Sequence, residues 1–206
     1  MYANAAGAKI FYDVVAGEQP VLLLHGFGSD STRTWVGAGW PRALDGRGAV
    51  LVDLRGHGQS DRPDTGYSPR EMAADVAAVL DAAGMSTMDA VGYSMGGLVA
   101  WELARQGRVR RLVLGGIDGR PVSEEDLPPG LPACADAVVG HGIDGDPPVP
   151  VLVVAGEADA LAAEAGAFAA RIGAPFVPVP RRNHVTAVSS RVFKQAAIAF
   201  FGVPFG

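Results

Sequence analysis

The sequence predicts an α/β protein, a three-layer α/β/α sandwich built around a mostly parallel sheet. Two observations support this prediction: short runs of continuously apolar residues, and helical patterns that separate them. Continuous rather than alternating apolar character is typical of parallel strands that are buried on both faces. Strands that alternate with helices indicate βαβ units. The apolar runs lie at residues 21–25, 49–54, 88–94, 111–117 and 149–156.

Two weaker runs complete the predicted sheet. Residues 9–17 open it, and residues 175–180 form a strand that is interrupted by Pro178. Because proline has no N–H to donate to a neighbouring strand, we expect this last strand at the edge of the sheet.

The clearest helix is predicted over residues 68–84, where Ser68 and Glu71 form a capping box. Pro69 suits its first position, Gly84 ends it, and an apolar stripe runs along Met72, Val76, Val79 and Leu80. Two further helices are predicted at residues 95–107 and 190–201.

Residues 118–148 break this alternation, because they are rich in proline and glycine. Only residues 132–140 suggest a short helix there, so we expect a lid or crossover between two strands. The sequence contains neither an internal repeat nor a second core-forming segment. We therefore predict a single domain over residues 1–206, with 118–148 as its short lid or crossover.

Composition narrows the class of protein. Of the 206 residues 49% are hydrophobic and 19% are charged, which is typical of a globular protein. The net charge of −5 argues against a nucleic-acid or anionic membrane surface. We expect neither a signal peptide nor a membrane-spanning helix, because the sequence lacks a basic leader and any run of about 18 apolar residues. Cys134 has no second cysteine to pair with, which favours a reducing, cytoplasmic location. Arginine, alanine and glycine outnumber lysine strongly, which suggests a GC-rich, bacterial genome.

Ser94 lies at a sharp corner in "VGYSMGGLVA", residues 91–100. A G-x-S-x-G pattern is modest support for a nucleophile in a glycine-rich chain, and a simple turn serine is the alternative. The context favours the nucleophile, because a strand precedes the serine and a helix follows it. Gly92 and Gly96 lack the side chains that would collide where strand and helix meet.

A serine nucleophile needs a base, and the chain offers four histidines. His184 lies in the loop "RRNHVTA" before the last helix, from which it reaches the carboxyl edge of the sheet. We therefore predict His184 as the base. His25, His57 and His141 are interpreted as structural.

The acid that orients this base is predicted to be Asp159, just past the end of the fifth apolar run. Asp118, just past the fourth run, is the competitor, and Glu157 is a weaker option. Asp53 and Asp61 precede the serine and fit the order nucleophile, acid, base less well.

Two backbone N–H groups are candidates for stabilising a tetrahedral oxyanion. Met95 follows the serine, and Phe27 lies in "HGFG", where flanking glycines permit a tight turn. Such donors are each worth roughly 10²–10³ in rate. The alternative interpretation of "HGFG" is an ordinary glycine-rich loop.

Taken together, these motifs resemble the α/β-hydrolase-fold serine hydrolases. They comprise "HGFG" 25–28, "DLRGHGQSDRP" 53–63, "GYSMGG" 92–97, "AGEAD" 155–159 and His184. The similarity runs from about residue 8 to the end of the chain. It implies a catalytic triad of Ser94, Asp159 and His184, with Phe27 and Met95 as oxyanion donors. It also implies that the turn at residues 55–60 is structural.

The chain departs from many such hydrolases at three places. Residues 118–148 replace a large helical cap, which predicts a more open site. Asn183 precedes the predicted base where glycine is frequent, and the proline that often follows the acid is missing after Asp159.

The expected activity is hydrolysis of carboxylic esters through an acyl-enzyme, with a small ester-like molecule as substrate. A thioesterase, a C–C bond hydrolase and a cofactor-free perhydrolase use the same apparatus and remain alternatives. A ligand-binding protein with vestigial activity is a further one. Serine at the corner argues against the aspartate-dependent dehalogenases and epoxide hydrolases. No motif for a metal or an organic cofactor is present, so none is expected.

Two side-chain pairs near the site have less specific interpretations. We expect Trp35 and Trp40 to pack a helix onto the sheet rather than to line an acyl pocket. We expect Arg181 and Arg182 to be solvated rather than to attract an anionic substrate. The oligomeric state is not predicted.

Overall fold

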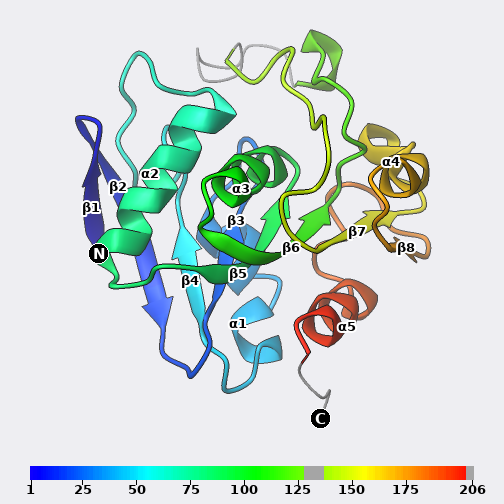
Figure 1. Cartoon of the computed structure of the whole chain (residues 1–206), viewed down its shortest axis with the longest axis horizontal. Coiled ribbons are helices and arrows are strands. Elements are labelled where there is room, and N and C mark those ends of the chain that lie inside the picture. The colour runs from blue at the N-terminus through cyan, green and yellow to red at the C-terminus, as the bar shows by residue number, and fades with distance from the viewer. Residues whose placement is uncertain (128–136, 203–206) are drawn as a thin grey trace.

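The computed structural model describes residues 1–127 and 137–202. Its sheet has the strand order β1-β2-β4-β3-β5-β6-β7-β8 (Figure 1). The strands are β1 (Tyr2–Ala5), β2 (Ala8–Val15), β3 (Val21–Leu24), β4 (Ala49–Val52), β5 (Met88–Tyr93), β6 (Val109–Gly115), β7 (Val151–Gly156) and β8 (Phe176–Val179). From β4 to β8 in this order neighbouring strands pair in parallel. Strand β2 pairs antiparallel with β4, and β1 pairs antiparallel with β2 at the edge. The predicted fold class, an α/β sandwich with a mostly parallel sheet, is confirmed.

The five strongly apolar runs form β3 to β7, whose side chains are almost all buried because helices cover both faces of the sheet. Strand β8 occupies the edge, as its proline predicted, with Pro178 opposite Ala155. The sequence did not indicate β1. It pairs with β2 through a tight turn in which Ala6 and Gly7 both have positive φ (44° and 81°).

Helices cover the two faces of the sheet (Figure 1). They are α1 (Trp40–Ala43), α2 (Pro69–Ala82), α3 (Met95–Arg105), α4 (Ala165–Arg171) and α5 (Arg191–Phe200). One core cluster joins α2, α3 and α4 to the sheet, and the other joins α1 and α5 to the opposite face. The expected capping box of α2 forms, since the Ser68 side chain accepts from the Glu71 N–H and the Glu71 carboxylate accepts from the Ser68 N–H. The sequence did not indicate α4.

Trp35 and Trp40 lie in the second core cluster and are fully buried. Their rings meet edge to face at a centroid distance of 5.3 Å, and Trp40 Nε1 donates to the Val188 carbonyl at 2.8 Å. Both therefore pack helical segments onto the sheet, as expected, rather than lining the cleft described below.

Residues 118–148, which we call the crossover segment, join β6 to β7. Its described part contains one 3₁₀ turn (Glu124–Asp126) and an isolated bridge between Val122 and Val139. The helix predicted at 132–140 falls largely outside the described residues, and residues 137–140 within them are not helical. Cys134 also lies outside the described residues.

Candidate active site

Ser94 lies between the last residue of β5 and the first residue of α3. Its backbone has φ 53° and ψ −123°, a conformation that is costly for any residue other than glycine. Two glycines allow it. A Cβ on Gly92 would approach Gly97 Cα to 2.7 Å, and one on Gly96 would lie 2.5 Å from the His25 carbonyl oxygen. The turn therefore forms only if these two positions lack side chains, which supports the interpretation made from the motif.

His184 and Asp159 come together from loops that follow β8 and β7. His184 Nδ1 lies 3.0 Å from each carboxylate oxygen of Asp159, whose side chain is fully buried. The Leu161 N–H also donates to this carboxylate at 3.1 Å. Since Nδ1 faces the carboxylate, Nε2 is the nitrogen left to exchange a proton. Ser94 and His184 line one cleft, although no hydrogen bond joins them within the described residues.

The contacts of Asn183 in the His184 loop account for asparagine at a position where related hydrolases often have glycine. The Asn183 side-chain oxygen accepts hydrogen bonds from the N–H groups of Val185 (3.2 Å) and Thr186 (3.0 Å) and from the Thr186 hydroxyl (2.9 Å). Asn183 does not have a positive φ, so the loop does not need glycine there. The asparagine thus closes the turn through its side chain.

Tyr93, the residue before Ser94, was missed in the sequence. Its hydroxyl donates to the His184 carbonyl at 2.6 Å, and its ring lies 5.4 Å from the imidazole. Burial raises the pKa of Tyr93, so the hydroxyl stays a donor. A Cβ on Gly115 or Gly116 would come within 2.6–2.8 Å of the ring. Two glycines in a row at the end of a buried strand indicate that a large side chain packs against them. This was the feature of the sequence that could have pointed to the Tyr93 ring.

The "HGFG" loop packs directly against the serine. A Cβ on Gly26 would lie 3.2 Å from the Ser94 Cβ, and Phe27 lines the same cleft as Ser94. Within the described residues, neither the Phe27 N–H nor the Met95 N–H donates a hydrogen bond. Both groups are therefore free to donate to an oxygen beside Ser94.

His25 is fully buried behind this loop and orients it. Its Nε2 accepts from the Leu54 N–H at 3.0 Å, so its Nδ1 carries the proton and donates to the Gly26 carbonyl at 2.8 Å. In a trans peptide the carbonyl and the following N–H point in opposite directions. Holding the Gly26 carbonyl therefore turns the Phe27 N–H away from His25. Burial lowers the pKa of His25 to about 4, so the ring is neutral at pH 7.

His57, whose ring centroid lies 5.2 Å from that of His25, makes the same pair of backbone hydrogen bonds as His25. His57 Nε2 accepts from the Gly28 N–H at 3.1 Å, and Nδ1 donates to the Arg55 carbonyl at 2.9 Å. Burial lowers the pKa of His57 as well. Both histidines are thus placed as structural groups, as the sequence suggested.

The other candidate acids bind groups other than His184. Asp118 accepts from the Arg120 backbone N–H at 3.2 Å, and Glu157 accepts from the Arg181 N–H at 3.3 Å. Asp53 is buried and bound to the backbone N–H groups of Ser31 and Gln59. Asp61 accepts from the Lys9 N–H on the edge strand β2. Of these five carboxylates, only Asp159 contacts the imidazole.

The comparison with family models agrees with the fold. The model of the alpha/beta hydrolase fold matches residues 19–138, which is more than half of the chain. The chain belongs to the α/β-hydrolase fold family.

Individual curated proteins are similar to parts of the chain. A 2-hydroxymuconate semialdehyde hydrolase from Pseudomonas putida is 43% identical over 103 residues, which cover 48% of this chain and 37% of that protein. A soluble epoxide hydrolase from Corynebacterium sp. is 30% identical over 143 residues, which cover 68% of this chain and 49% of that protein. The chain spans less than half the length of these curated relatives. The solved structure of Est816, an N-acyl homoserine lactone degrading enzyme, is 25% identical with a TM-score of 0.79, covering 97% of this chain and all of that one.

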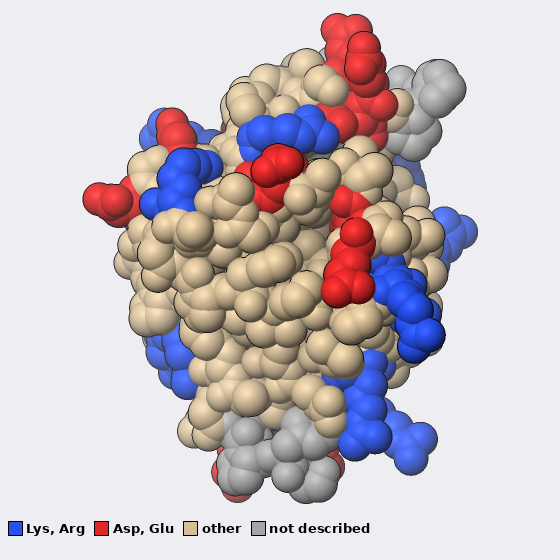
Figure 2. Space-filling model, turned by 90° about the vertical axis from the view of Figure 1, so that its right-hand side faces the viewer, with Lys and Arg blue, Asp and Glu red and all other residues tan. Residues whose placement is uncertain are grey.

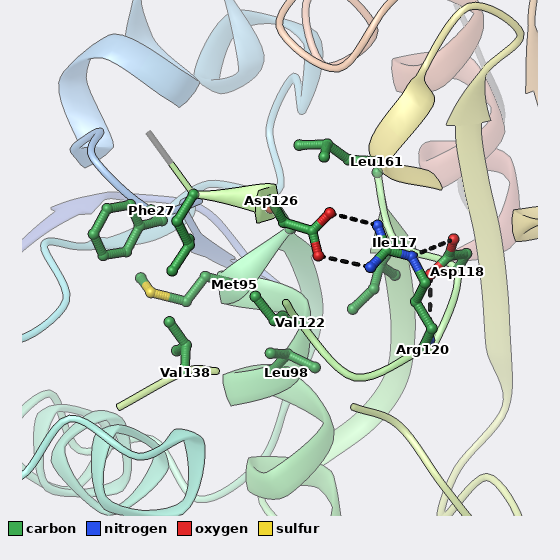
Figure 3. A pocket seen from close by; sticks show the side chains of 13 residues that line it. Phe27, Met95, Leu98, Ile117, Asp118, Arg120, Val122, Asp126, Val138 and Leu161 are labelled. Carbon is green, nitrogen blue, oxygen red and sulfur yellow. Dashed lines mark hydrogen bonds and ion pairs between the residues drawn. The ribbon is translucent and has the colours of Figure 1, made fainter. Parts of the chain in front are cut away.

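Two hollows meet at Ser94 in this α/β-hydrolase-fold protein. A wide cleft of about 600 Å³ is lined by Ser94, His184, Val185, Val188 and Arg33, among others. A narrow cavity of about 70 Å³ shares Ser94 and Asp126 with this cleft (Figure 3). Its lining is apolar at Met95, Leu98, Ile117, Val122 and Val138, and charged at Asp118, Arg120 and Asp126.

Residues 1–127 and 137–202 contain no group of three or more His, Cys, Asp or Glu arranged to hold a metal ion. No helix in these ranges is long and apolar enough to cross a membrane.

Proposed function

We propose that this family member is a serine hydrolase that cleaves carboxylic esters through an acyl-enzyme intermediate. The observation that carries the proposal is the convergence of three side chains. Ser94 stands on a strained turn, and His184, bound to buried Asp159, lines the same cleft. This is the arrangement that activates a serine hydroxyl in hydrolases of unrelated folds.

In the proposed reaction, Ser94 Oγ attacks the ester carbonyl carbon while His184 Nε2 takes its proton. Asp159 holds the imidazolium that forms, and the Phe27 and Met95 N–H groups donate hydrogen bonds to the negatively charged carbonyl oxygen. The C–O bond then breaks, and His184 returns the proton to the departing alkoxide. A water molecule attacks the acyl-enzyme in the same way and releases the acid and free Ser94.

The fit of the residues to these steps supports the proposal. The Phe27 and Met95 N–H groups have no acceptor among residues 1–127 and 137–202, and the cleft beside His184 is wide enough for a leaving group. Est816 is described as degrading an N-acyl homoserine lactone, a compound that contains a cyclic ester. We further propose a small ester-like substrate and no cofactor. The single cysteine of the sequence supports a reducing, cytoplasmic location.

A second candidate is hydrolysis of a carbon–carbon bond. The observation that favours it is the 43% identity to the 2-hydroxymuconate semialdehyde hydrolase over 103 residues. The same serine, histidine and aspartate would serve, so only the substrate distinguishes the two. Assays of esters beside vinylogous diketones separate these candidates.

The test replaces the nucleophile. Ser94→Ala should lower turnover of short-chain p-nitrophenyl esters by about 10⁴-fold or more. It should also abolish labelling by a fluorophosphonate while leaving the melting temperature at or above that of the wild type. Ser86→Ala is the matched control, because Ser86 is exposed at the opposite end of β5. Ester turnover that survives in folded Ser94→Ala protein would overturn the assigned nucleophile.

A further inference from the structure

The crossover segment carries most of the acidity of the chain. Residues 118–148 contain seven carboxylates and one guanidinium, a net charge of −6 with histidine neutral, while the whole chain has −5. Acidic side chains gather at the end of the molecule where this segment lies (Figure 2). Three of the charged groups of the segment line the narrow cavity beside Ser94. The charge therefore faces a substrate directly.

Arg120 is bound between two carboxylates in the wall of this cavity (Figure 3). Its Nη1 and Nη2 donate to the two oxygens of Asp126 at 2.6 and 2.7 Å, and its Nε lies 3.4 Å from Asp118. Nη1 also donates to the Pro121 carbonyl at 3.4 Å. These contacts engage four of the five N–H groups of the guanidinium. One N–H group of the Arg120 guanidinium is left to bind a substrate carboxylate.

The three charges sum to one negative charge. The side-chain hydrogen bond from Arg120 holds the pKa of Asp126 below its ordinary value, and Asp126 raises the pKa of Arg120. Both partners are therefore ionised at neutral pH. Asp118, with its side chain 3% exposed, adds the uncompensated carboxylate.

The geometry of proton transfer decides which half of an ester meets this wall. The leaving group must receive its proton from His184, which lines the wide cleft and not the narrow cavity. The acyl chain then extends into the narrow cavity, past Met95 toward Leu98 and Ile117. Asp118 and Arg120 line this cavity alone, whereas Asp126 lines both hollows. That path is apolar on its floor and negatively charged on its wall.

We propose that the substrates are esters of short, uncharged acyl groups, and that the Asp118–Arg120–Asp126 cluster excludes acyl chains that end in a carboxylate. The proposal rests on the proposed ester hydrolysis and names the substrate class of the same site. An aliphatic chain gains contact with the apolar floor. A terminal carboxylate would meet a negative wall whose only cation is already bound.

The test compares two ethyl esters of equal chain length, ethyl pentanoate and monoethyl glutarate, by ethanol release. For the wild type, kcat/KM for monoethyl glutarate should be at least about tenfold lower than for ethyl pentanoate. Asp126→Asn removes one negative charge and frees Arg120, so this ratio should narrow by about tenfold. Asp118→Asn should also lower the ratio of kcat/KM for ethyl pentanoate to kcat/KM for monoethyl glutarate. This variant replaces Asp126→Asn in the test if Asp126→Asn folds poorly.

Glu124→Gln is the matched control, because it makes the same charge change on the same segment at an exposed residue that lines neither hollow. It should leave the ratio within about twofold of the wild type. Equal or faster hydrolysis of monoethyl glutarate by the wild type would overturn the proposal, since Arg120 would then exchange Asp126 for the substrate carboxylate. An equal effect of Glu124→Gln and Asp126→Asn would also overturn it, because the discrimination would then come from overall charge.

Labelling of Ser94 separates this proposal from the proposed function. Fluorophosphonates with a butyl or a carboxybutyl arm react with an activated serine whether or not esters are substrates. Slower labelling by the carboxybutyl reagent, restored in Asp126→Asn, would support the charged wall even if ethyl esters are not hydrolysed. In that case the ester activity would be wrong and the acyl preference would stand. Equal labelling by both reagents would overturn the preference.

Discussion

The two halves of the Ser94 site are held in place by different forces. In one half, the turn at Ser94 and the loop at residues 25–28 touch backbone to backbone, and a Cβ on Gly96 would overlap the Leu24 and His25 carbonyls. In the other half, side-chain hydrogen bonds and ion pairs hold the His184 loop and the crossover segment. We refer to these as the backbone half and the side-chain half.

This difference predicts which residues of the site tolerate substitution and which do not. Gly92 and Gly96 in the backbone half have no room for an added side chain, so the geometry of the turn is fixed by sterics and supports the proposed chemistry. The side-chain half depends on polar contacts at Arg120, Asn183 and Tyr93, each of which is replaceable at a modest cost in free energy. We therefore expect substitutions in the backbone half to disrupt folding, and those in the side-chain half to tune rate and specificity.

The largest expected effect comes from adding a methyl group to the backbone half. Gly96→Ala should lower the free energy of unfolding by about 3–5 kcal/mol, because the new Cβ must displace backbone atoms of the β3 end. Urea denaturation followed by circular dichroism measures this change.

The neighbouring residue is its control. A Cβ on Gly97 would lie 3.4 Å from a Leu114 methyl and 3.5 Å from the Gly92 carbonyl, which are close but tolerable contacts. Gly97→Ala should therefore change stability by less than about 1 kcal/mol. Equal losses in the two variants would mean that the steric distinction between the positions is wrong.

The second prediction tests the buried histidine that supports the backbone half. His25 has a pKa of about 4 in the folded protein, and 6.5 is its ordinary value. The unfolded chain therefore binds a proton more readily between these values, and stability must fall as the pH falls through this window. The loss reaches about 3 kcal/mol below pH 4. His57 adds to the lowering of the pKa, whereas Asp53 and Asp30 oppose it.

Other groups also titrate in acid, so the slope of stability against pH must be compared between the wild type and variants. Urea unfolding from pH 4 to 7.5 should give a steep slope in the wild type and in His141→Gln, since His141 is exposed. The slope should be shallower in His25→Gln, whose amide can replace both hydrogen bonds without taking up a proton. An unchanged slope in folded His25→Gln protein would assign the acid sensitivity to other groups.

Much of the backbone half could be predicted from the sequence, because sterics leave a local trace. The glycines at positions 92 and 96 stand at fixed spacing from Ser94, and continuous apolar runs announce buried parallel strands. The order of Ser94, Asp159 and His184 then followed from the positions of the strand ends. The structure brings Asp159 and His184 together as this order requires.

The side-chain half was largely hidden, since its contacts join distant residues without any periodicity. Tyr93 and His184 are 91 positions apart, and nothing in either local sequence signals the pair. The Arg120 cluster lies in a segment whose composition suggested only a lid or crossover. Strand β1 was missed for another reason, because "YANA" has little β propensity and forms a strand only through pairing with β2.

The smallest expected effect tests whether the two halves are coupled. Tyr93 belongs to the backbone half by position, yet its hydroxyl holds the His184 carbonyl. Tyr93→Phe keeps the ring and removes one hydrogen bond worth about 1 kcal/mol, so kcat should fall about fivefold. KM for an ester should stay unchanged, and Tyr2→Phe on exposed β1 should change neither constant. A fall in kcat alone would show that the strand that ends beside Ser94 also positions His184. Unchanged kcat in Tyr93→Phe would mean instead that the Asn183 turn holds His184 by itself, and that the two halves are independent.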